Sequence, residues 1–152
     1  FIFLMFIGAS PGSFGGGIKT NTFVLIIYSF FATVRGKNKV EIYNRTVSSN
    51  LLYKSFSILL FAILTIIIGW FFLLITNPEI DPIFLLFEQT SAFSTVGLST
   101  GNTTKNLSEV GQYIIIITMF IGRIGTLLMA FSLIQKRKSS NYNYPKAHLM
   151  IG

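Results

Sequence analysis

Apolar residues in this chain gather in long uninterrupted runs, and the segments between these runs are rich in glycine, hydroxyl or basic side chains. The clearest run, 58–75, holds no charged residue, and 51–57 extends it toward the N-terminus. A helix of about 20 consecutive apolar residues is long enough to cross a bilayer. The pattern therefore predicts a membrane-spanning helix, which Asn77 and Pro78 end.

A second long run, 112–134, is apolar except for Arg123 near its centre. An arginine at that depth costs about 2.5–3.5 kcal/mol on insertion scales, and such residues usually face protein or water. The alternative is a side chain that reaches the lipid headgroups, which lie about ten residues away along the helix. We therefore expect a second spanning helix in which Arg123 has a functional role.

The N-terminal part is apolar at 1–7 and again at 23–34, but neither run is long enough to cross a bilayer. Between them, 8–20 contains five glycines and a proline. Each glycine disfavours a helix interior by about 1 kcal/mol and a proline by about 3 kcal/mol. We predict two half-helices with a break between them, which together are long enough to cross.

Two other interpretations of the glycine-rich segment stay open. Gly12 and Gly17 have the spacing of a phosphate-binding loop, but Ile18 separates Gly17 from Lys19, whereas the motif requires the lysine directly after the glycine. A glycine-rich surface linker is the other alternative. Linkers usually have polar neighbours, however, and both flanks of this segment are strongly apolar.

A short apolar segment, 82–93, follows Asp81 and Pro82. This pair is a helix-start signal, because Asp can cap free N–H groups and Pro is tolerated at the first helical position. The predicted helix is about 18 Å long and reaches only the middle of a bilayer of about 30 Å. An amphipathic surface helix is the alternative.

The polar stretch FSTVGLSTG, 93–101, comes directly after that short helix. An extended turn with glycine at the end of a half-crossing helix can aim backbone carbonyls at a cation pathway. The negative end of the helix dipole would also favour a cation there. We therefore interpret 93–101 as one segment of an ion-selectivity filter, followed by a polar outer loop at 102–111.

Composition and charge agree with a membrane protein. The chain is 51% hydrophobic and only 11% charged, whereas soluble domains carry about 25% charged residues. Its net charge of +7 is concentrated in 35–54 and 136–146, as is typical of the cytoplasmic side of membrane proteins, and it does not indicate nucleic-acid binding. Cysteine is absent and His148 is the single histidine, so no thiolate or histidine metal cluster is expected.

Three stretches carry a family resemblance: GASPGSFGGGIKT at 8–20, SAFSTVGLSTG at 91–101 and FIGRIG at 120–125. Together they make the chain resemble membrane subunits of the Trk/Ktr/HKT superfamily of potassium transporters, most of all the bacterial KtrB branch. The resemblance covers essentially the whole chain. One departure from true potassium channels is that Leu98 and Ser99 replace the Tyr-Gly of the T-V-G-Y-G filter.

The resemblance implies an all-α integral membrane fold, built from helix–pore loop–helix repeats of a potassium-channel-like pore with a broken gate helix. In the family, four linked and non-identical repeats surround the pore. We expect 1–34 to be the broken transmembrane helix of the third repeat, with its intramembrane gate loop. A cytoplasmic loop at 35–50, the fourth repeat at 51–135 and a cytoplasmic tail at 136–152 would follow.

Roles for individual residues also follow from the resemblance. The backbone carbonyls of Thr95, Val96, Gly97 and Leu98 would bind potassium in the filter. The predicted gate comprises Gly8, Ser10, Gly12, Ser13, Gly15, Gly16, Gly17, Lys19, Thr20 and Arg123. In this scheme the arginine contacts the gate loop and opposes the passage of cations.

The resemblance further implies potassium uptake in the bacterial plasma membrane, without enzymatic chemistry or an organic cofactor, and leaves sodium coupling open. Its implied partners are membrane lipid, a second copy in a homodimer, and a cytosolic nucleotide-binding regulatory ring of the KtrA/TrkA-like kind. Because the chain opens at Phe1 inside an apolar run, we expect it to be a piece of a longer protein. Alternatives are a membrane-bound ATPase component and a non-conducting truncated remnant.

Overall fold

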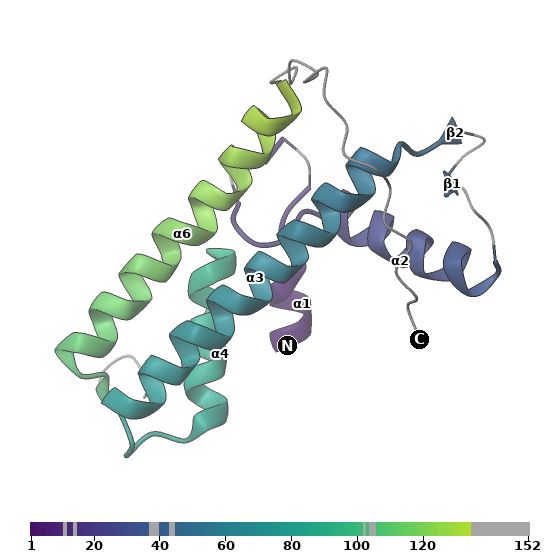
Figure 1. Ribbon diagram of the computed structural model, residues 1–152. Coiled ribbons are helices and arrows are strands. Elements are labelled where there is room, and N and C mark those ends of the chain that lie inside the picture. Colours follow the sequence, from purple (N-terminus) through teal and green to yellow (C-terminus); the bar gives the residue numbers. More distant parts are fainter. Residues whose placement is uncertain are drawn as a thin grey trace, which may run out of the picture.

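The computed structural model describes residues 1–10, 12–13, 15–36, 40–42, 45–101, 103 and 106–134, without side-chain detail at 45 and 125–134. Two long helices, a half-length helix and a short N-terminal helix pack together, and another helix crosses one of the long ones (Figure 1). The elements are α1 (Ile2–Phe6), α2 (Thr20–Val34), β1 (Glu41–Ile42), β2 (Arg45–Thr46), α3 (Ser49–Thr76), α4 (Pro82–Ser94) and α6 (Glu109–Ile134).

The predicted spanning helix at 58–75 is α3, which has 28 residues and is therefore about 42 Å long. Within the described residues it is the helix whose length and composition suffice to cross a membrane. The second predicted span corresponds to α6, a helix of 26 residues. Many large apolar side chains of α3 are exposed, among them Leu60, Phe61, Ile67, Ile68, Phe71, Phe72 and Ile75. A surface of this kind suits lipid or neighbouring helices, not water.

The predicted break in the first span lies between α1 and α2. The two ends of this loop are held together, because Gly8 N–H donates to the Ile18 carbonyl at 2.8 Å and Ile18 N–H donates to the Phe6 carbonyl at 3.3 Å. These bonds form a short parallel bridge between Ile7 and Ile18. The segment is therefore a closed loop, and α2 leaves it to cross α3 (Figure 1).

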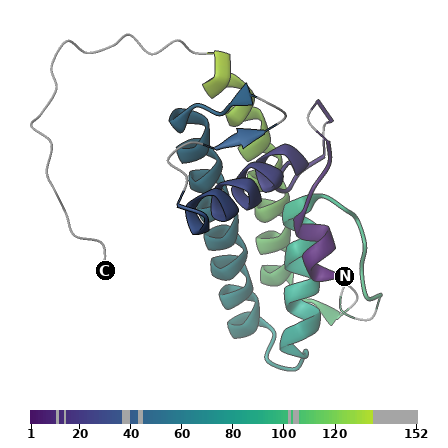
Figure 2. The same cartoon turned by 90° about the vertical axis from the view of Figure 1, so that its right-hand side faces the viewer.

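Helix α4 packs against α3, α6 and α1 (Figures 1 and 2). It starts at Pro82 after the N-cap residue Asp81, as predicted, but the expected side-chain cap is absent: the Asp81 side chain makes no capping hydrogen bond. The Asp81 backbone carbonyl instead accepts from the N–H groups of Phe84 and Leu85, at 3.0 and 3.2 Å. The proline ring occupies a position whose N–H would have no helical partner, so the helix can begin without the side chain.

Two apolar clusters hold these helices together. The first joins the loop residue Ile18 to Ala62 and Ile66 of α3 and Phe93 of α4. The second lies toward the other end of α4 and comprises Leu73, Leu85 and Leu107, with Trp70, Leu74, Ile80, Ile114 and Ile115 packed around it. The first cluster fixes the glycine-rich loop beside the C-terminal end of α4, which is where the filter stretch begins.

The basic connection at 35–50 contains a feature that the sequence did not predict. Strands β1 and β2 pair in antiparallel fashion, with Glu41 opposite Thr46 and Ile42 opposite Arg45. Strands of two residues are too short to give an alternating pattern of apolar and polar residues. The predicted cytoplasmic tail, 136–152, lies outside the described residues.

Candidate ion pathway

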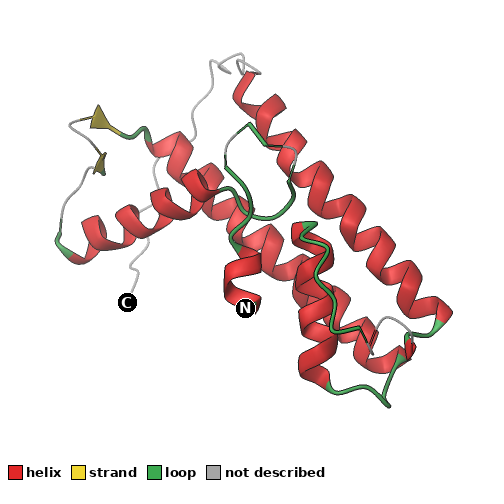
Figure 3. Cartoon of the chain, turned by 180° about the vertical axis from the view of Figure 1, so that it is seen from behind, coloured by secondary structure: helices red, strands yellow, loops and turns green. Residues whose placement is uncertain are grey.

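The filter stretch begins where α4 ends in a left-handed turn. Thr95 has φ 52° and ψ 39°, and its N–H donates to the Ala92 carbonyl at 3.1 Å. Val96 N–H donates to the Ser91 carbonyl at 3.0 Å, and Gly97 has φ 80°. Positive φ is uncommon for a β-branched residue such as Thr95. The turn reverses the chain, which then returns alongside α4 (Figure 3).

The returning segment is tied to α4 by side chains. Ser91 Oγ donates to the Leu98 carbonyl at 2.6 Å, and Ser99 Oγ donates to Glu88 Oε1 at 2.6 Å. The side chains of Val96 and Leu98 are 43% and 49% exposed, so neither anchors the segment by burial. A carbonyl oxygen has two lone pairs, so Leu98 can accept from Ser91 and still offer a lone pair to a cation.

The glycine-rich loop touches the same turn from the other side. Gly16 N–H donates to Thr95 Oγ1 at 2.8 Å. A Cβ atom at Gly16 would lie 2.8 Å from the Phe93 carbonyl oxygen, and one at Gly17, whose φ is 78°, would lie 3.1 Å from Ser94 Oγ. Real Cβ atoms essentially never approach within 3.0 Å of another heavy atom. Glycine is therefore what lets the loop pack on the first filter residue.

Lys19 closes the loop on itself. Its Nζ donates to the backbone carbonyls of Ser13 at 2.6 Å and Gly15 at 3.2 Å. The ammonium thus satisfies two carbonyl groups of its own loop. Thr20, directly after Lys19, begins α2. Of the other predicted gate residues, Gly12 has φ 92° with open space around it, and the Ser10 carbonyl accepts from Ser13 N–H at 3.1 Å.

Helix α6 reaches the same place through Gly122. A Cβ atom there would lie 2.0 Å from the Phe93 carbonyl oxygen, so α6 passes directly over the end of α4. The neighbouring Arg123 lies on an exposed face of α6. The structure therefore brings the loop, the start of the filter and the 121–123 turn of α6 together. The predicted contact of Arg123 with the gate loop stays a prediction.

An open cavity of about 460 Å³ lies between α1, the loop and the filter stretch. It is lined by Phe1, Leu4, Met5, Ile7, Gly8, Ala9, Gly15, Ser94, Thr95, Val96 and Leu98. Both predicted sites, the filter and the gate, thus border a single space. An opening of this kind is where non-helical backbone is tolerated at membrane depth.

Comparison with known proteins decides the family. A family model described as cation transport protein, TrkH, matches residues 1–143. The chain belongs to the TrkH family. It is 44% identical over 98% of its length to the Bacillus subtilis Ktr system potassium uptake protein D, and 38% identical over 99% to potassium uptake protein B of the same organism. It is also 34% identical over 99% of its length to the potassium/sodium uptake protein NtpJ of Enterococcus hirae.

The chain spans about a third of the length of these relatives, 33% for both Bacillus proteins and 34% for the Enterococcus protein. TrkH membership and the long apolar helix α3 together identify a bacterial membrane protein. They confirm the predicted family and the helical membrane fold. The division into 1–34, 35–50, 51–135 and 136–152 and the roles of the single residues stay predictions.

TrkH proteins are transporters and not enzymes, so the family gives no support to the ATPase alternative. The loop geometry agrees. In a phosphate-binding loop, backbone N–H groups and the lysine face an anion. Here the Lys19 ammonium binds two carbonyls, and Gly16 N–H donates to Thr95 of another element.

Two buried polar residues that organise this TrkH chain escaped the sequence analysis. Gln89 is fully buried, and its Nε2 donates to Thr118 Oγ1 of α6 at 3.0 Å. Asn77, which was expected only to end α3, also joins the C-terminal end of α3 to the residue before α6, because its Oδ1 accepts from Ser108 N–H at 2.7 Å. A polar side chain inside an apolar helix is a signal for such contacts, since it is costly in lipid without a partner.

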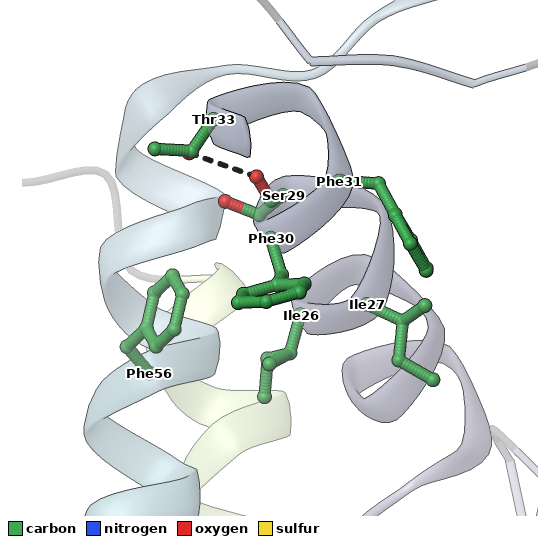
Figure 4. Close-up of a pocket in the computed structure, with 7 residues that line it drawn as sticks. All are labelled: Ile26, Ile27, Ser29, Phe30, Phe31, Thr33 and Phe56. Carbon is green, nitrogen blue, oxygen red and sulfur yellow. Dashed lines mark hydrogen bonds between the residues drawn. The ribbon is translucent and has the colours of Figure 1, made fainter. Parts of the chain in front are cut away.

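A second hollow of about 600 Å³ lies between α2 and α3, away from the filter (Figure 4). It is lined by Ile26, Ile27, Ser29, Phe30, Phe31, Thr33 and Phe56. The Thr33 hydroxyl donates to the Ser29 carbonyl at 2.9 Å within α2, which leaves an almost entirely apolar surface. Such a lining suits an acyl chain or another helix better than an ion.

Proposed function

We propose that this chain supplies the fourth filter segment and the intramembrane gate of a potassium uptake pore of the TrkH family. The observation that carries the proposal is the hydrogen bond from Gly16 N–H to Thr95 Oγ1, because it joins the glycine-rich loop to the first filter residue. The names of the Bacillus relatives, which are potassium uptake proteins, support the choice of ion.

In this function the backbone carbonyls of Thr95, Val96, Gly97 and Leu98 replace part of the hydration shell of potassium. One segment contributes only part of the ligand ring, and three sister segments complete it. The cavity beside these residues supports the assignment, since it gives an ion a path to the segment. No covalent bond is made or broken, so the chain only selects potassium and lets it pass.

The loop between α1 and α2 acts as the gate below the filter. Opening requires the Gly16 to Thr95 hydrogen bond to break, while the bonds at the base of the loop can stay intact. Arg123, on the exposed face of α6 beside the packed Gly122, adds a positive charge that opposes cations in the closed state. Replacing Arg123 with Ala should therefore ease permeation.

The whole protein works as a homodimer docked on a cytosolic nucleotide-binding ring, with the basic segment 35–54 facing that ring or anionic lipid headgroups. The name of the Enterococcus relative, a potassium/sodium uptake protein, supports sodium as a second ion to test. Uptake measured with and without external sodium distinguishes coupled from uncoupled transport.

The test of the pore is Gly97→Asp in the complete transporter, with potassium uptake measured in cells that lack other uptake systems. Gly36→Asp is the matched control, because Gly36 also has positive φ, at 67° against 80° for Gly97, and open space around it. We expect Gly97→Asp to abolish uptake and Gly36→Asp to keep it. Wild-type uptake by Gly97→Asp would reject the filter assignment.

The test of the gate is deletion of 12–17 in the same transporter. The deletion removes Gly16 and with it the hydrogen bond to Thr95, so we expect a raised basal potassium leak. Nucleotide binding by the purified membrane protein without the cytosolic ring would instead favour the ATPase alternative. An unchanged leak in a correctly inserted protein would reject the gate.

A further inference from the structure

Glu88 is a carboxylate in the half-length helix α4, and its side chain is 9% exposed. Burying a carboxylate costs several kcal/mol unless hydrogen bonds replace its water. Glu88 Oε1 accepts from Ser99 Oγ at 2.6 Å, from Thr100 N–H at 3.0 Å and from Thr100 Oγ1 at 3.3 Å. Donors from the segment that follows the filter thus meet one oxygen of this residue.

The hydrogen bonds to Glu88 are one of two attachments between α4 and the segment that follows the filter stretch. Ser91 lies three residues after Glu88, so both side chains are on the same face of α4. Ser91 Oγ holds the Leu98 carbonyl at 2.6 Å, and Glu88 holds the next two residues. The returning segment 98–100 is therefore fastened to α4 at consecutive positions. We call Glu88 and Ser91 the filter brace.

The brace continues outward beyond Thr100. Ser99 Oγ, which donates to Glu88, also accepts from Gly101 N–H at 3.1 Å. Thr100 Oγ1 contacts the hydroxyl of Thr103, a buried residue of the outer loop. Glu88 is thus the point on α4 from which hydrogen bonds spread over the outer side of the filter stretch. Bonds to a charged acceptor are roughly twice as strong as bonds between neutral groups.

We propose that Glu88 is a positioning residue that sets ion discrimination by holding segment 98–100 against α4. The inference rests on the proposed function, because it assigns to Glu88 the task of fixing the filter carbonyls. Carbonyl ligands discriminate between ions only if their number and arrangement hold. Without the hydrogen bonds to Glu88, segment 98–100 is less firmly held. The Leu98 and Gly97 carbonyls can then move inward and coordinate a smaller ion.

The experiment measures the ratio of potassium to sodium permeation by the complete transporter in proteoliposomes. Glu88→Leu removes the acceptor of these hydrogen bonds, and we expect the ratio to fall about tenfold, which corresponds to about 1.4 kcal/mol. Glu88→Gln keeps an acceptor oxygen without the charge and should stay within about threefold of wild type. Glu79→Leu removes an exposed carboxylate and should leave the ratio unchanged.

A second set of variants tests the same hydrogen bonds from the donor side, in case Glu88→Leu fails to assemble. Ser99→Ala combined with Thr100→Val removes two donors from the opposite side of the same bonds. The combination should lower the ratio, and adding Glu88→Leu to it should lower it little further, because coupled residues are not additive. Full additivity, or a wild-type ratio in Glu88→Leu with normal flux, would overturn the assignment.

Failure of this inference is distinguishable from failure of the proposed function. If Gly97→Asp abolishes flux while Glu88→Leu keeps wild-type ion discrimination, the filter assignment is retained and the proposed role of Glu88 is rejected. If Glu88→Gln lowers the ratio as much as Glu88→Leu, the charge and not the positioned oxygen is responsible, which also overturns the proposal. If Gly97→Asp leaves flux intact, the filter assignment itself is lost.

Discussion

At the scale of single residues, two glycines approach one carbonyl group from different elements. A Cβ atom would lie 2.8 Å from the Phe93 oxygen at Gly16 and 2.0 Å from it at Gly122. Phe93 is two residues before Thr95, where the filter turn begins. The positions of the loop and of α6 relative to the filter are therefore set by the absence of side chains at these two places.

Gly122→Ala should destabilise the protein, because the new methyl group meets a backbone oxygen that cannot rotate away. Overpacking of this kind costs about 1–3 kcal/mol. We expect a lower midpoint of thermal unfolding for the complete protein in detergent. Phe120→Ala, at a side chain of α6 that is 67% exposed, is the control and should move the midpoint little. Equal midpoints for wild type and Gly122→Ala would contradict the packing.

Thr95→Val tests the hydrogen bond between gate and filter. Valine keeps the β-branched shape but lacks the hydroxyl that accepts from Gly16 N–H at 2.8 Å. We expect a severalfold higher basal potassium leak from proteoliposomes. Thr95→Ser retains the acceptor and should behave like wild type. A leak that is the same in both variants would show that the bond does not hold the gate.

At the scale of elements, α3 and α4 fit together through Gly69 and Gln89. A Cβ atom at Gly69 would lie 1.8 Å from Gln89 Nε2, so the amide fills the space that the glycine leaves. The same Nε2 reaches Thr118 on α6, which links three helices through one side chain. Small residues at helix contacts and interhelical hydrogen bonds are the means by which helices associate in lipid.

Gly69→Ala should therefore destabilise the helix packing by about 1–3 kcal/mol, since the new methyl group would meet the fully buried Gln89 side chain. Gln89→Ala empties that space. In the double variant the two effects should partly cancel, which a double-mutant cycle of unfolding free energies measures. Strict additivity of the two free-energy changes would show that the residues are not in contact.

Lys19→Met should loosen the loop between α1 and α2. Methionine has a similar length, but it cannot donate to the Ser13 and Gly15 carbonyls as the ammonium does. We expect faster proteolysis within the loop and a raised basal leak. Lys54→Met, which removes the same charge from α3, is the control. Indistinguishable protection in the two variants would argue against a closing role for Lys19.

The elements themselves were largely predictable from the sequence. Run length located α3 and α6, and the glycines with Pro11 located the break between α1 and α2. Asp81 is the N-cap residue of α4, as predicted, but its side chain makes no capping hydrogen bond, because a proline start does not require one. Glu88 was not predicted as a contact of Ser99, since a lone acid in an apolar helix has no motif and its partner lies eleven positions away.

At the scale of the whole molecule, many large apolar side chains of the described residues are exposed. They occur on α1, α2, α3, α4 and α6, as Phe3, Phe30, Phe61, Ile83 and Phe120 illustrate. Apolar surfaces of this kind suit contact with lipid. The exposed Val96 and Leu98 border the cavity beside the predicted filter and would suit contact with neighbouring repeats in the proposed pore.

Residues 1–152 produced alone should therefore insert but not conduct. We expect no potassium flux from proteoliposomes that contain only this segment, and flux when it is produced together with the part of a relative such as the Bacillus protein D that this chain does not match. The complete relative is the positive control. Conduction by the segment alone would indicate that several copies assemble a pore by themselves.

The hydrogen bond between Trp70 and Pro82 offers a built-in optical probe. Trp70 is the single tryptophan of the chain, and its Nε1 donates to the Pro82 carbonyl at 2.9 Å, where α4 begins. Its ring also packs against the cluster around Leu73 and Leu85. Indole emission shifts in colour when its surroundings become wetter. The fluorescence of this segment thus reports, without any label, whether the start of α4 stays packed against α3.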